Sequence, residues 1–352
     1  MTTEAPLLTV VVPAYRSAPM LRACLAGINA SELPRHQFEI VVVDDCSNDS
    51  TGDVAREFAD TLLATIDGPR GPAAARNIGA IAAHGSIVVF IDSDVVVAPT
   101  TLSEFLHFFN QHSDFSAVFG AYDDAPRETG FISQYRNLLH RYVHLSHAGQ
   151  ATTFWAGCGA VRRAAFLAVD GFDEARYPRP QIEDIDLGYR LTAAGYRIML
   201  DPELIGTHLK RWTLGGMLRT DLRDRAVPWM HLLMEQRAVG GSGALNVSRA
   251  EKLFTILAAL AAISLVLTVW AREWLWLAVV SLAIIVVGNV KLLAWFRSVR
   301  GSWFALRVVP LRILFYLIGG AGAAWAIATY RFQPVRSTRT QLRASNRAAD
   351  AR

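Results

Sequence analysis

Short apolar runs alternate with segments of helical spacing over the first part of the chain. The runs are rich in β-branched residues, as strands are, and cover residues 7–12, 38–43, 62–66 and 87–91. Between them, helical spacing extends over residues 20–29, 51–58 and 71–83. This alternation predicts an α/β fold with a parallel, doubly wound sheet. Because such sheets bind ligands at the carboxyl ends of their strands, the loops after these strands are the candidate site.

A different pattern begins after residue 250, where almost uninterrupted apolar runs follow one another. They cover about residues 253–271, 274–292 and 308–329. Each is close to the roughly 20 residues that cross a bilayer. A very apolar core helix would explain any one of them, but three in succession favour a helical membrane region over residues 251–330. This region accounts for a chain that is 52% hydrophobic and only 19% charged.

Basic residues around these runs predict their orientation. One group precedes the first run: Lys210, Arg211, Arg219, Arg223 and Arg225. Another lies between the second and third runs: Arg297, Arg300, Arg307 and Arg312. Because basic loops stay in the cytoplasm, we expect a multi-pass protein of the inner (plasma) membrane with a cytoplasmic N-terminal domain. Three spans would place the Arg-rich tail on the other side, so a re-entrant third run and a translocated tail both stay open.

The segments outside the domain and the runs complete the organisation. Residues 213–250 mix large apolar residues with arginines, which predicts a helix lying in the headgroup layer, with packing onto the N-terminal domain as the alternative. Residues 331–352 form a basic tail that we expect to be disordered. Residues 1–6 are polar and short, so we expect no signal peptide.

The cysteines and the net charge exclude two classes of site. Cys24, Cys46 and Cys158 are widely spaced without a C-x-x-C pair, which argues against a zinc site and fits a reducing compartment. The formal net charge of the 352 residues is only +4, and we expect no nucleic-acid partner.

Two carboxylates one residue apart follow the most apolar strand. The run at residues 87–91 leads directly into Asp92-Ser93-Asp94. Alternate residues of a strand share a face, so Asp92 and Asp94 can point the same way and repel each other unless a cation lies between them. A hard divalent ion with oxygen ligands would satisfy them. A polar turn that caps the next helix is the alternative.

Further polar residues follow neighbouring strands. Tyr15, Asp44, Asp45 and Arg76 are predicted to lie on the same edge as the aspartate pair. Aspartates there can accept hydrogen bonds from a nucleobase or ribose, and an arginine fork suits phosphate oxygens. Capping of the helix at Thr51 and a solvated surface charge are the alternatives for single members of the set.

Two later segments carry candidate chemistry. Gly157-Cys158-Gly159-Ala160 is rich in small residues, as a backbone close to a ligand would be, or as a tight turn before a helix at 162–169 would be. Glu183, Asp184 and Asp186 open a predicted helix. The helix dipole would stabilise these carboxylates, so the pKa of Asp184 is expected to be lowered. Dipole complementation alone is the alternative explanation of the cluster.

These motifs, in this order, resemble the family 2 glycosyltransferases with the GT-A fold. The resemblance covers roughly residues 7–212 and rests on residues 11–15, 42–51, 75–79, 92–94, 157–160, 171–174 and 183–187. The family usually has Gly where this chain has Cys46, and often Asn where it has Gly159. Both are small residues, and we interpret the departures as tolerated.

The resemblance implies a role for each matching residue. Residues implied in nucleotide-sugar binding are Pro13, Tyr15, Asp44, Asp45, Arg76, Asp92 and Ser93. Residues implied in holding a divalent metal, Mg²⁺ or Mn²⁺, are Asp94, Asp92 and His208. Asp184 matches the catalytic base, with Glu183 as its neighbour. Residues implied on the side of the sugar and acceptor are Gly157, Cys158, Gly159, Arg211 and Trp212.

The resemblance also implies a reaction. We expect an inverting, metal-dependent transfer from a nucleotide-diphosphate sugar, with UDP favoured, to a lipid-linked or glycan acceptor at the membrane, as in cell-envelope polysaccharide synthesis. The catalytic domain would cover residues 1–212. His208-Leu209-Lys210-Arg211-Trp212 is similar to the Q-x-x-R-W motif of processive synthases with His in place of Gln, which leaves processivity open. A nucleotidyltransferase and an inactive nucleotide-sugar-binding scaffold are the alternatives.

Overall fold

The computed structural model describes residues 6–235 and 248–330. The predicted tail at 331–352, part of the predicted segment at 213–250 and most of residues 1–6 lie outside them.

The first half of the catalytic sheet is parallel, as predicted. Its strands are β1 (Leu8–Ala14), β2 (Phe38–Asp44), β3 (Thr61–Ala64) and β4 (Ile87–Ile91), in the order β3-β2-β1-β4. The helices between them are α1 (Ala18–Asn29), α2 (Thr51–Phe58) and α3 (Pro72–Ala82). Strands β1 and β4 are buried along their whole length, which explains their nearly continuous apolar sequence.

The second half of the sheet is mixed, and its strands lie beyond those for which the alternation predicted parallel pairing. It adds β5 (Val95–Val97), β6 (Phe115–Tyr122), β7 (Gly149–Ala151), β8 (Cys158–Arg162) and β9 (Arg197–His208). Strand β8 lies between β4 and β6 and is antiparallel to both, whereas β9 is parallel to β6. The turn considered at Gly157–Ala160 is therefore mostly a buried strand. Its helical neighbours are α4 (Thr101–Gln111), α5 (Phe131–Ser146), α6 (Arg163–Ala168) and α7 (Glu183–Ala193).

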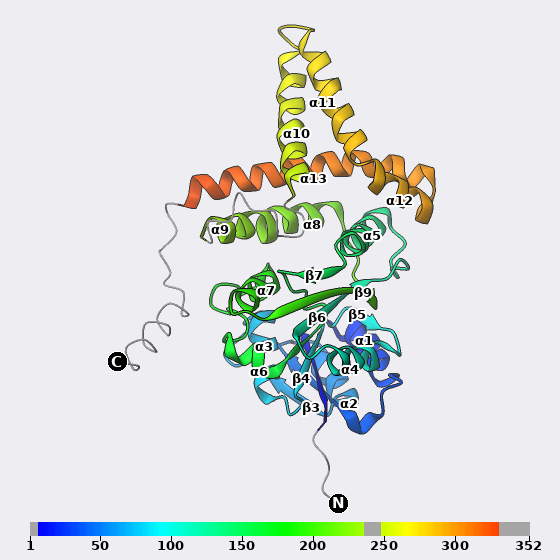
Figure 1. Ribbon diagram of the computed structural model, residues 1–352, viewed down its shortest axis with the longest axis vertical. Coiled ribbons are helices and arrows are strands. Elements are labelled where there is room, and N and C mark those ends of the chain that lie inside the picture. The colour runs from blue at the N-terminus through cyan, green and yellow to red at the C-terminus, as the bar shows by residue number, and fades with distance from the viewer. Residues whose placement is uncertain (1–5, 236–247, 331–352) are drawn as a thin grey trace, which may run out of the picture.

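One helical rod follows the sheet and separates it from the C-terminal helices. It consists of α8 (Leu214–Arg219), a π-helical segment (Thr220–Ala226) and α9 (Val227–Glu235). In Figure 1 it lies between the catalytic domain and α13 (Ser302–Thr329). The contact is close, because a Cβ at Gly322 of α13 would lie 2.6 Å from the Cβ of Ala226.

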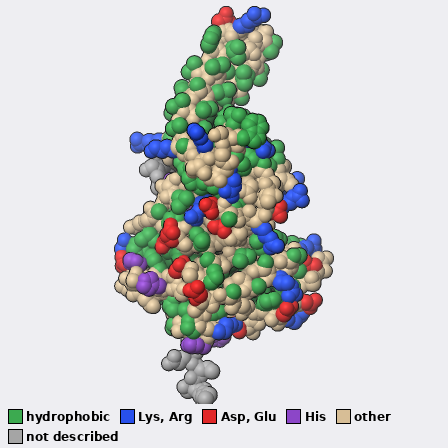
Figure 2. Space-filling view, turned by 90° about the vertical axis from the view of Figure 1, so that its right-hand side faces the viewer, with side chains coloured by type: hydrophobic (Ala, Val, Ile, Leu, Met, Phe, Trp, Pro, Cys, Tyr) green, Lys and Arg blue, Asp and Glu red, His purple; other side chains and the backbone are tan. Residues whose placement is uncertain are grey.

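The C-terminal helices project from this base. Helices α10 (Arg249–Leu267) and α11 (Trp274–Gly288) form a hairpin that points away from the catalytic domain, while α13 runs across its foot (Figure 1). Hydrophobic side chains cover the hairpin in Figure 2, and charged ones gather mainly below it. Helices α10 and α13 are long and apolar enough to cross a membrane. The predicted second span is α11 plus the start of α12 (Val290–Arg300), bent by 60°.

A buried polar network ties the foot of the hairpin together. Arg312 of α13 pairs with Glu251 of α10 at 3.1 Å and donates to Asn289, at the α11–α12 bend, at 3.2 Å. Tyr316 also donates to Asn289, at 3.1 Å. The network fixes the three C-terminal elements to one another directly above the catalytic domain.

Candidate active site

A cavity of about 1090 Å³ extends from the carboxyl ends of β1 and β4 to the apolar helices α10 and α13. Predicted site residues that line it are Pro13, Tyr15, Asp45, Arg76, Asp92, Ser93, Asp94, Glu183, Asp184, His208 and Trp212. Residues from the C-terminal helices, among them Glu251, Thr255 and Gly319, line its other end. The candidate site therefore joins the edge of the sheet to the base of the C-terminal helices.

Two buried ion pairs link the strand edge to the start of α7. Arg76 Nη2 lies 2.6 Å from Asp92 Oδ1, and Arg76 Nη1 lies 3.0 Å from Glu183 Oε1. Burial opposes the charge on Arg76, but the two carboxylates outweigh it and raise the pKa of Arg76. The predicted phosphate fork thus has both its terminal nitrogens in use, and it fixes the position of α7 relative to β4.

Asp184 lies beside this bridge. Its Oδ2 accepts a hydrogen bond from the backbone N–H of Ala156 at 3.3 Å. Burial and the adjacent charge of Glu183 raise the pKa of Asp184 to about 7, against the opposing effect of Arg76. The expectation of a lowered pKa is wrong, because burial outweighs the helix dipole here. A carboxylate with a pKa near neutrality is well suited to take up a proton during a reaction.

Asp94 and His208 form a second polar pair across β5 and β9. Asp94 Oδ2 lies 3.4 Å from His208 Nε2, while His208 Nδ1 donates to Asn137 Oδ1 at 2.5 Å. In a neutral imidazole this leaves Nε2 as an acceptor that faces a carboxylate. Burial acts to raise the pKa of Asp94, but the hydrogen bond and charge of His208, together with Lys210, lower it. The pair is satisfied by a proton or a cation between its two atoms.

The donor set fits a divalent ion shared with a substrate. Among residues 6–235 and 248–330, no group of three or more His, Cys, Asp or Glu side chains is placed to hold a metal ion by itself. Ions such as Mg²⁺ are often bound by one or two carboxylates, with substrate phosphates as further ligands. Asp92, the other predicted ligand, has one oxygen engaged by Arg76. Tyr122 stacks on His208 with the ring centroids 4.4 Å apart, which fixes the imidazole plane.

The two aspartates at the end of β2 accept hydrogen bonds from within the protein. Asp45 accepts from the Thr65 hydroxyl at 2.8 Å and from the backbone N–H groups of Arg70, at 2.7 Å, and Gly71, at 2.8 Å. Asp44 accepts from the backbone N–H of Ser47 at 3.1 Å. Asp45 lines the cavity while fixing the loop that leads into α3. Contact of either residue with a nucleotide stays a prediction.

Five predicted residues are not among those that line the cavity: Asp44, Gly157, Cys158, Gly159 and Arg211. Neighbouring protein atoms leave no room for a side chain at the two glycines. A Cβ at Gly157 would lie 2.5 Å from the Trp155 ring, and one at Gly159 would lie 2.4 Å from the Trp155 carbonyl oxygen. Cys158 is buried in β8, and Arg211 is exposed beside the site. The glycines thus leave room for Trp155, which does line the cavity.

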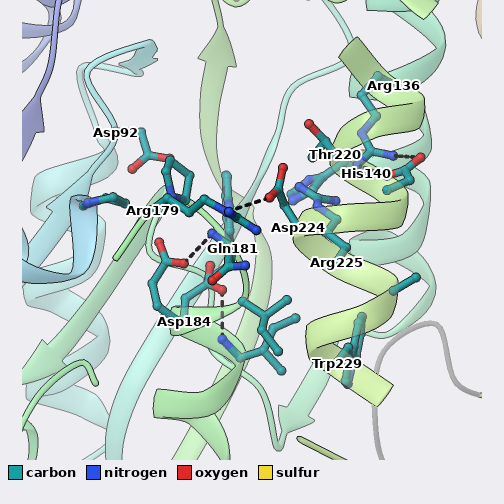
Figure 3. A pocket seen from close by; sticks show the side chains of 18 of the residues that line it. Asp92, Arg136, His140, Arg179, Gln181, Asp184, Thr220, Asp224, Arg225 and Trp229 are labelled. Atoms are coloured by element: carbon teal, nitrogen blue, oxygen red, sulfur yellow. Dashed lines mark hydrogen bonds and ion pairs between the residues drawn. The ribbon is translucent and has the colours of Figure 1, made fainter. Parts of the chain in front are cut away.

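Several lining residues were missed from the sequence. They are Tyr122, Arg136, His140, Trp155, Arg179, Asp221, Asp224, Arg225 and Trp229. Figure 3 shows Arg136, Asp224 and Arg225 on one side of the pocket and Asp92 and Asp184 on the other. The charge-rich sequence at 220–225 was the available signal, but it was assigned to the membrane surface.

Comparison with known proteins identifies the N-terminal domain. Residues 9–169 match the family model described as Glycosyl transferase family 2. Glycosyltransferase AglE of Haloferax volcanii is 36% identical over 98 residues, which are 27% of this chain and 32% of that protein. Validoxylamine A glucosyltransferase of Streptomyces hygroscopicus subsp. jinggangensis is 28% identical over 236 residues, 58% of this chain and 56% of the relative. The matches thus span about a third to about half of these relatives.

A solved structure shares the fold over most of the chain. It is a mannosyltransferase from Pyrobaculum calidifontis in complex with GDP-Man and Mn²⁺, with a TM-score of 0.57 and 21% identity over 92% of this chain and 88% of that one. At this identity, the likeness extends to the GT-A fold.

Proposed function

We propose that this chain, whose residues 9–169 match the model of family 2 glycosyltransferases, transfers a sugar, with inversion, from a nucleotide-diphosphate sugar to an acceptor held at the membrane. The observation that carries the proposal is the shared cavity, which Asp184 and residues of α10 and α13 line together. An acceptor that enters the cavity at the end lined by α10 and α13 could thus reach Asp184 through the cavity itself.

In the proposed reaction, Asp184 is the general base. Its carboxylate takes the proton of an acceptor hydroxyl as that oxygen forms a bond to the anomeric carbon. The bond from this carbon to the diphosphate breaks on the opposite face, so the configuration inverts and a nucleoside diphosphate leaves. A pKa of about 7 leaves a substantial share of Asp184 ionised at neutral pH.

The donor would occupy the strand edge. We propose that Pro13, Tyr15, Asp44, Asp45 and Ser93 form the nucleotide side, with UDP as the favoured nucleotide. Asp94 and His208, with an oxygen of Asp92, would hold Mg²⁺ or Mn²⁺ against the diphosphate. When bound, such an ion neutralises the leaving group.

Arg76 and Glu183 would keep the two halves of the site in register through their ion pairs. On the acceptor side, Trp212 faces the cavity and would contact the acceptor.

We propose the following organisation for the whole chain. A cytoplasmic catalytic domain over residues 1–212 is joined through residues 213–250 to membrane helices within residues 251–330, followed by a basic tail. Exposed hydrophobic residues on the hairpin, such as Ile256, Val269 and Trp276, support its insertion in the inner membrane.

The test uses the full chain purified in detergent. UDP-, GDP- and dTDP-sugars would be supplied with Mg²⁺ or Mn²⁺ and a lipid extract as acceptor, and nucleoside diphosphate and glycosylated lipid would be measured. We expect one donor class to be consumed, one glycolipid to form, and both to stop with EDTA.

Other outcomes identify the alternatives. Release of pyrophosphate would indicate a nucleotidyltransferase, and tight donor binding without turnover would indicate a scaffold. Equal turnover with a water-soluble acceptor and no lipid would contradict the membrane-held acceptor while leaving the transferase assignment intact.

A further inference from the structure

One guanidinium in the cavity lacks the partner that its neighbours have. Arg136 pairs with Asp221 at 2.7 Å, Arg179 with Asp224 at 3.0 Å, and Arg76 with its two carboxylates. Arg225 also lines the cavity, but it forms no ion pair or hydrogen bond with any residue in the described part of the chain. The two acidic residues of its own helical segment are therefore already engaged by other arginines.

The charge of Arg225 is open to a ligand. Arg225 is an exposed residue rather than one enclosed by packed side chains, and an arginine stays protonated at neutral pH. Arg225 faces open cavity rather than packed side chains, so there is room for an anion from outside the protein.

The backbone around Arg225 is also unusual. Arg225 belongs to the π-helical segment Thr220–Ala226, and such segments occur frequently at functional sites. The same segment packs on α13 through Ala226 and Gly322. Arg225 is thus placed where the catalytic domain meets the membrane helices.

Its place relative to Asp184 distinguishes the two substrates. In Figure 3, Arg225 lies across the pocket from both Asp92 and Asp184. An acceptor that reaches in from the end of the cavity lined by α10 and α13 would meet Arg225 on that side. An anion at Arg225 is therefore best placed as part of the acceptor.

We propose that Arg225 binds a phosphate group of the acceptor, so that the acceptor is a lipid phosphate whose chain extends toward α10 and α13. The role of this lipid phosphate as the acceptor rests on the proposed function. Its binding at Arg225 does not. The apolar and small residues at that end of the cavity, among them Ile256, Phe315 and Ala323, suit a hydrocarbon chain. Lys210 also lines the cavity, but its charge acts on Asp94, so it belongs to the proposed donor side.

Binding tests this proposal without requiring turnover. Farnesyl phosphate and uncharged farnesol would be titrated into the detergent-purified full chain by calorimetry, with wild type beside Arg225→Ala, Arg225→Lys and Arg223→Ala. Arg223 lies in the same π-helical segment but does not line the cavity, so it is the matched control.

We expect Arg225→Ala to weaken farnesyl phosphate binding about tenfold or more, because a charge-assisted hydrogen bond is lost. Arg225→Lys should recover part of this loss, while Arg223→Ala and the binding of farnesol should be unchanged. Binding of a UDP- or GDP-sugar should also be unaffected by Arg225→Ala.

The other outcomes overturn the proposal in distinguishable ways. If Arg225→Ala weakens only nucleotide-sugar binding, Arg225 belongs to the donor diphosphate. If Arg223→Ala has the same effect, the attraction is a general one of basic residues for a lipid phosphate. Unchanged farnesyl phosphate binding in Arg225→Ala would mean that the residue has no part in acceptor recognition. Normal phosphate binding in a protein that turns over no donor would contradict the proposed reaction but leave the site standing.

Discussion

At the strand ends where we propose that the donor binds, here called the donor edge, Asp45, Arg76 and Asp94 are each held by neighbouring groups, whereas near the C-terminal helices Arg225 has no ion pair within the described residues. The donor edge is thus fixed before any ligand arrives. The side near the C-terminal helices presents a charge that a ligand must complete. The difference suggests that one half of the site is preorganised for a constant part of the donor, while the other half recognises a particular acceptor.

The largest effect should follow from removing Asp184, which we propose as the base. Asp184→Asn should lower kcat about 10² to 10⁴-fold and leave the donor KM nearly unchanged, since a general base acts in the transition state. Initial rates at saturating donor would measure it. Asp186→Asn is the control on the same helix: Asp186 pairs with Arg190 at 2.7 Å and does not line the cavity, so its loss should affect stability rather than kcat. Equal losses of kcat in both variants would contradict the assignment of the base.

The next test breaks the preorganised half. Arg76→Met would leave Asp92 and Glu183 facing each other without their shared cation, and the latter carboxylate is buried. Removing one partner of a buried pair costs about 3–5 kcal/mol, so the melting temperature should fall markedly. Arg70→Met removes an exposed pair with Glu174 and should cost less than about 1 kcal/mol. Similar melting temperatures for the two variants would show that the Arg76 bridge is not what fixes the donor edge.

The acidity of Asp184 gives a pH prediction. Its pKa is raised to about 7, and the base acts when ionised, so kcat should increase about tenfold per pH unit below that value and level off above it. A rate profile between pH 5 and 9 would show this limb in wild type. The residual rate of Asp184→Asn should lack it. A profile that is already level at pH 5 would mean that Asp184 has an ordinary pKa when substrates are bound.

The two sides of the cavity also differ in how much of each could be predicted from the sequence. The donor edge follows from strand ends and short motifs, so Tyr15, Arg76 and Asp94 could be placed at the cavity from their spacing alone. The family resemblance predicts the position of Asp184. It does not predict the raised pKa of Asp184, because burial depends on the complete fold. His140 and Arg225 reach the cavity only through the packing of α5 and the π-helical segment against distant elements. No local pattern encodes those contacts.

The antiparallel insertion of β8 could not be predicted for a related reason. Its small residues indicate close approach in general, and they do not distinguish a ligand from a neighbouring side chain. In the structure the close neighbours of Gly157 and Gly159 are Trp155 and Phe154. The composition of the segment was therefore interpreted correctly as crowding, but the crowding group was misassigned.

The smallest expected effect concerns a departure from the family pattern within the fixed donor edge. Cys46 has a φ of 57°, in the left-handed region that costs a residue with a Cβ about 1 kcal/mol, which gives a physical reason for the usual Gly at this position. Its thiol also lies 3.1 Å from the carbonyl oxygen of Thr65, a weak compensating contact. Cys46→Gly and Cys46→Ala both remove the thiol, and only the first removes the strain. Glycine also increases the entropy of the unfolded chain, so we expect Cys46→Gly to lie within about 1 kcal/mol of wild type and to melt a few degrees above Cys46→Ala. A variant with Ala that melts at or above the one with Gly would show that this turn holds no strain, and that the chain tolerates Cys46 for another reason.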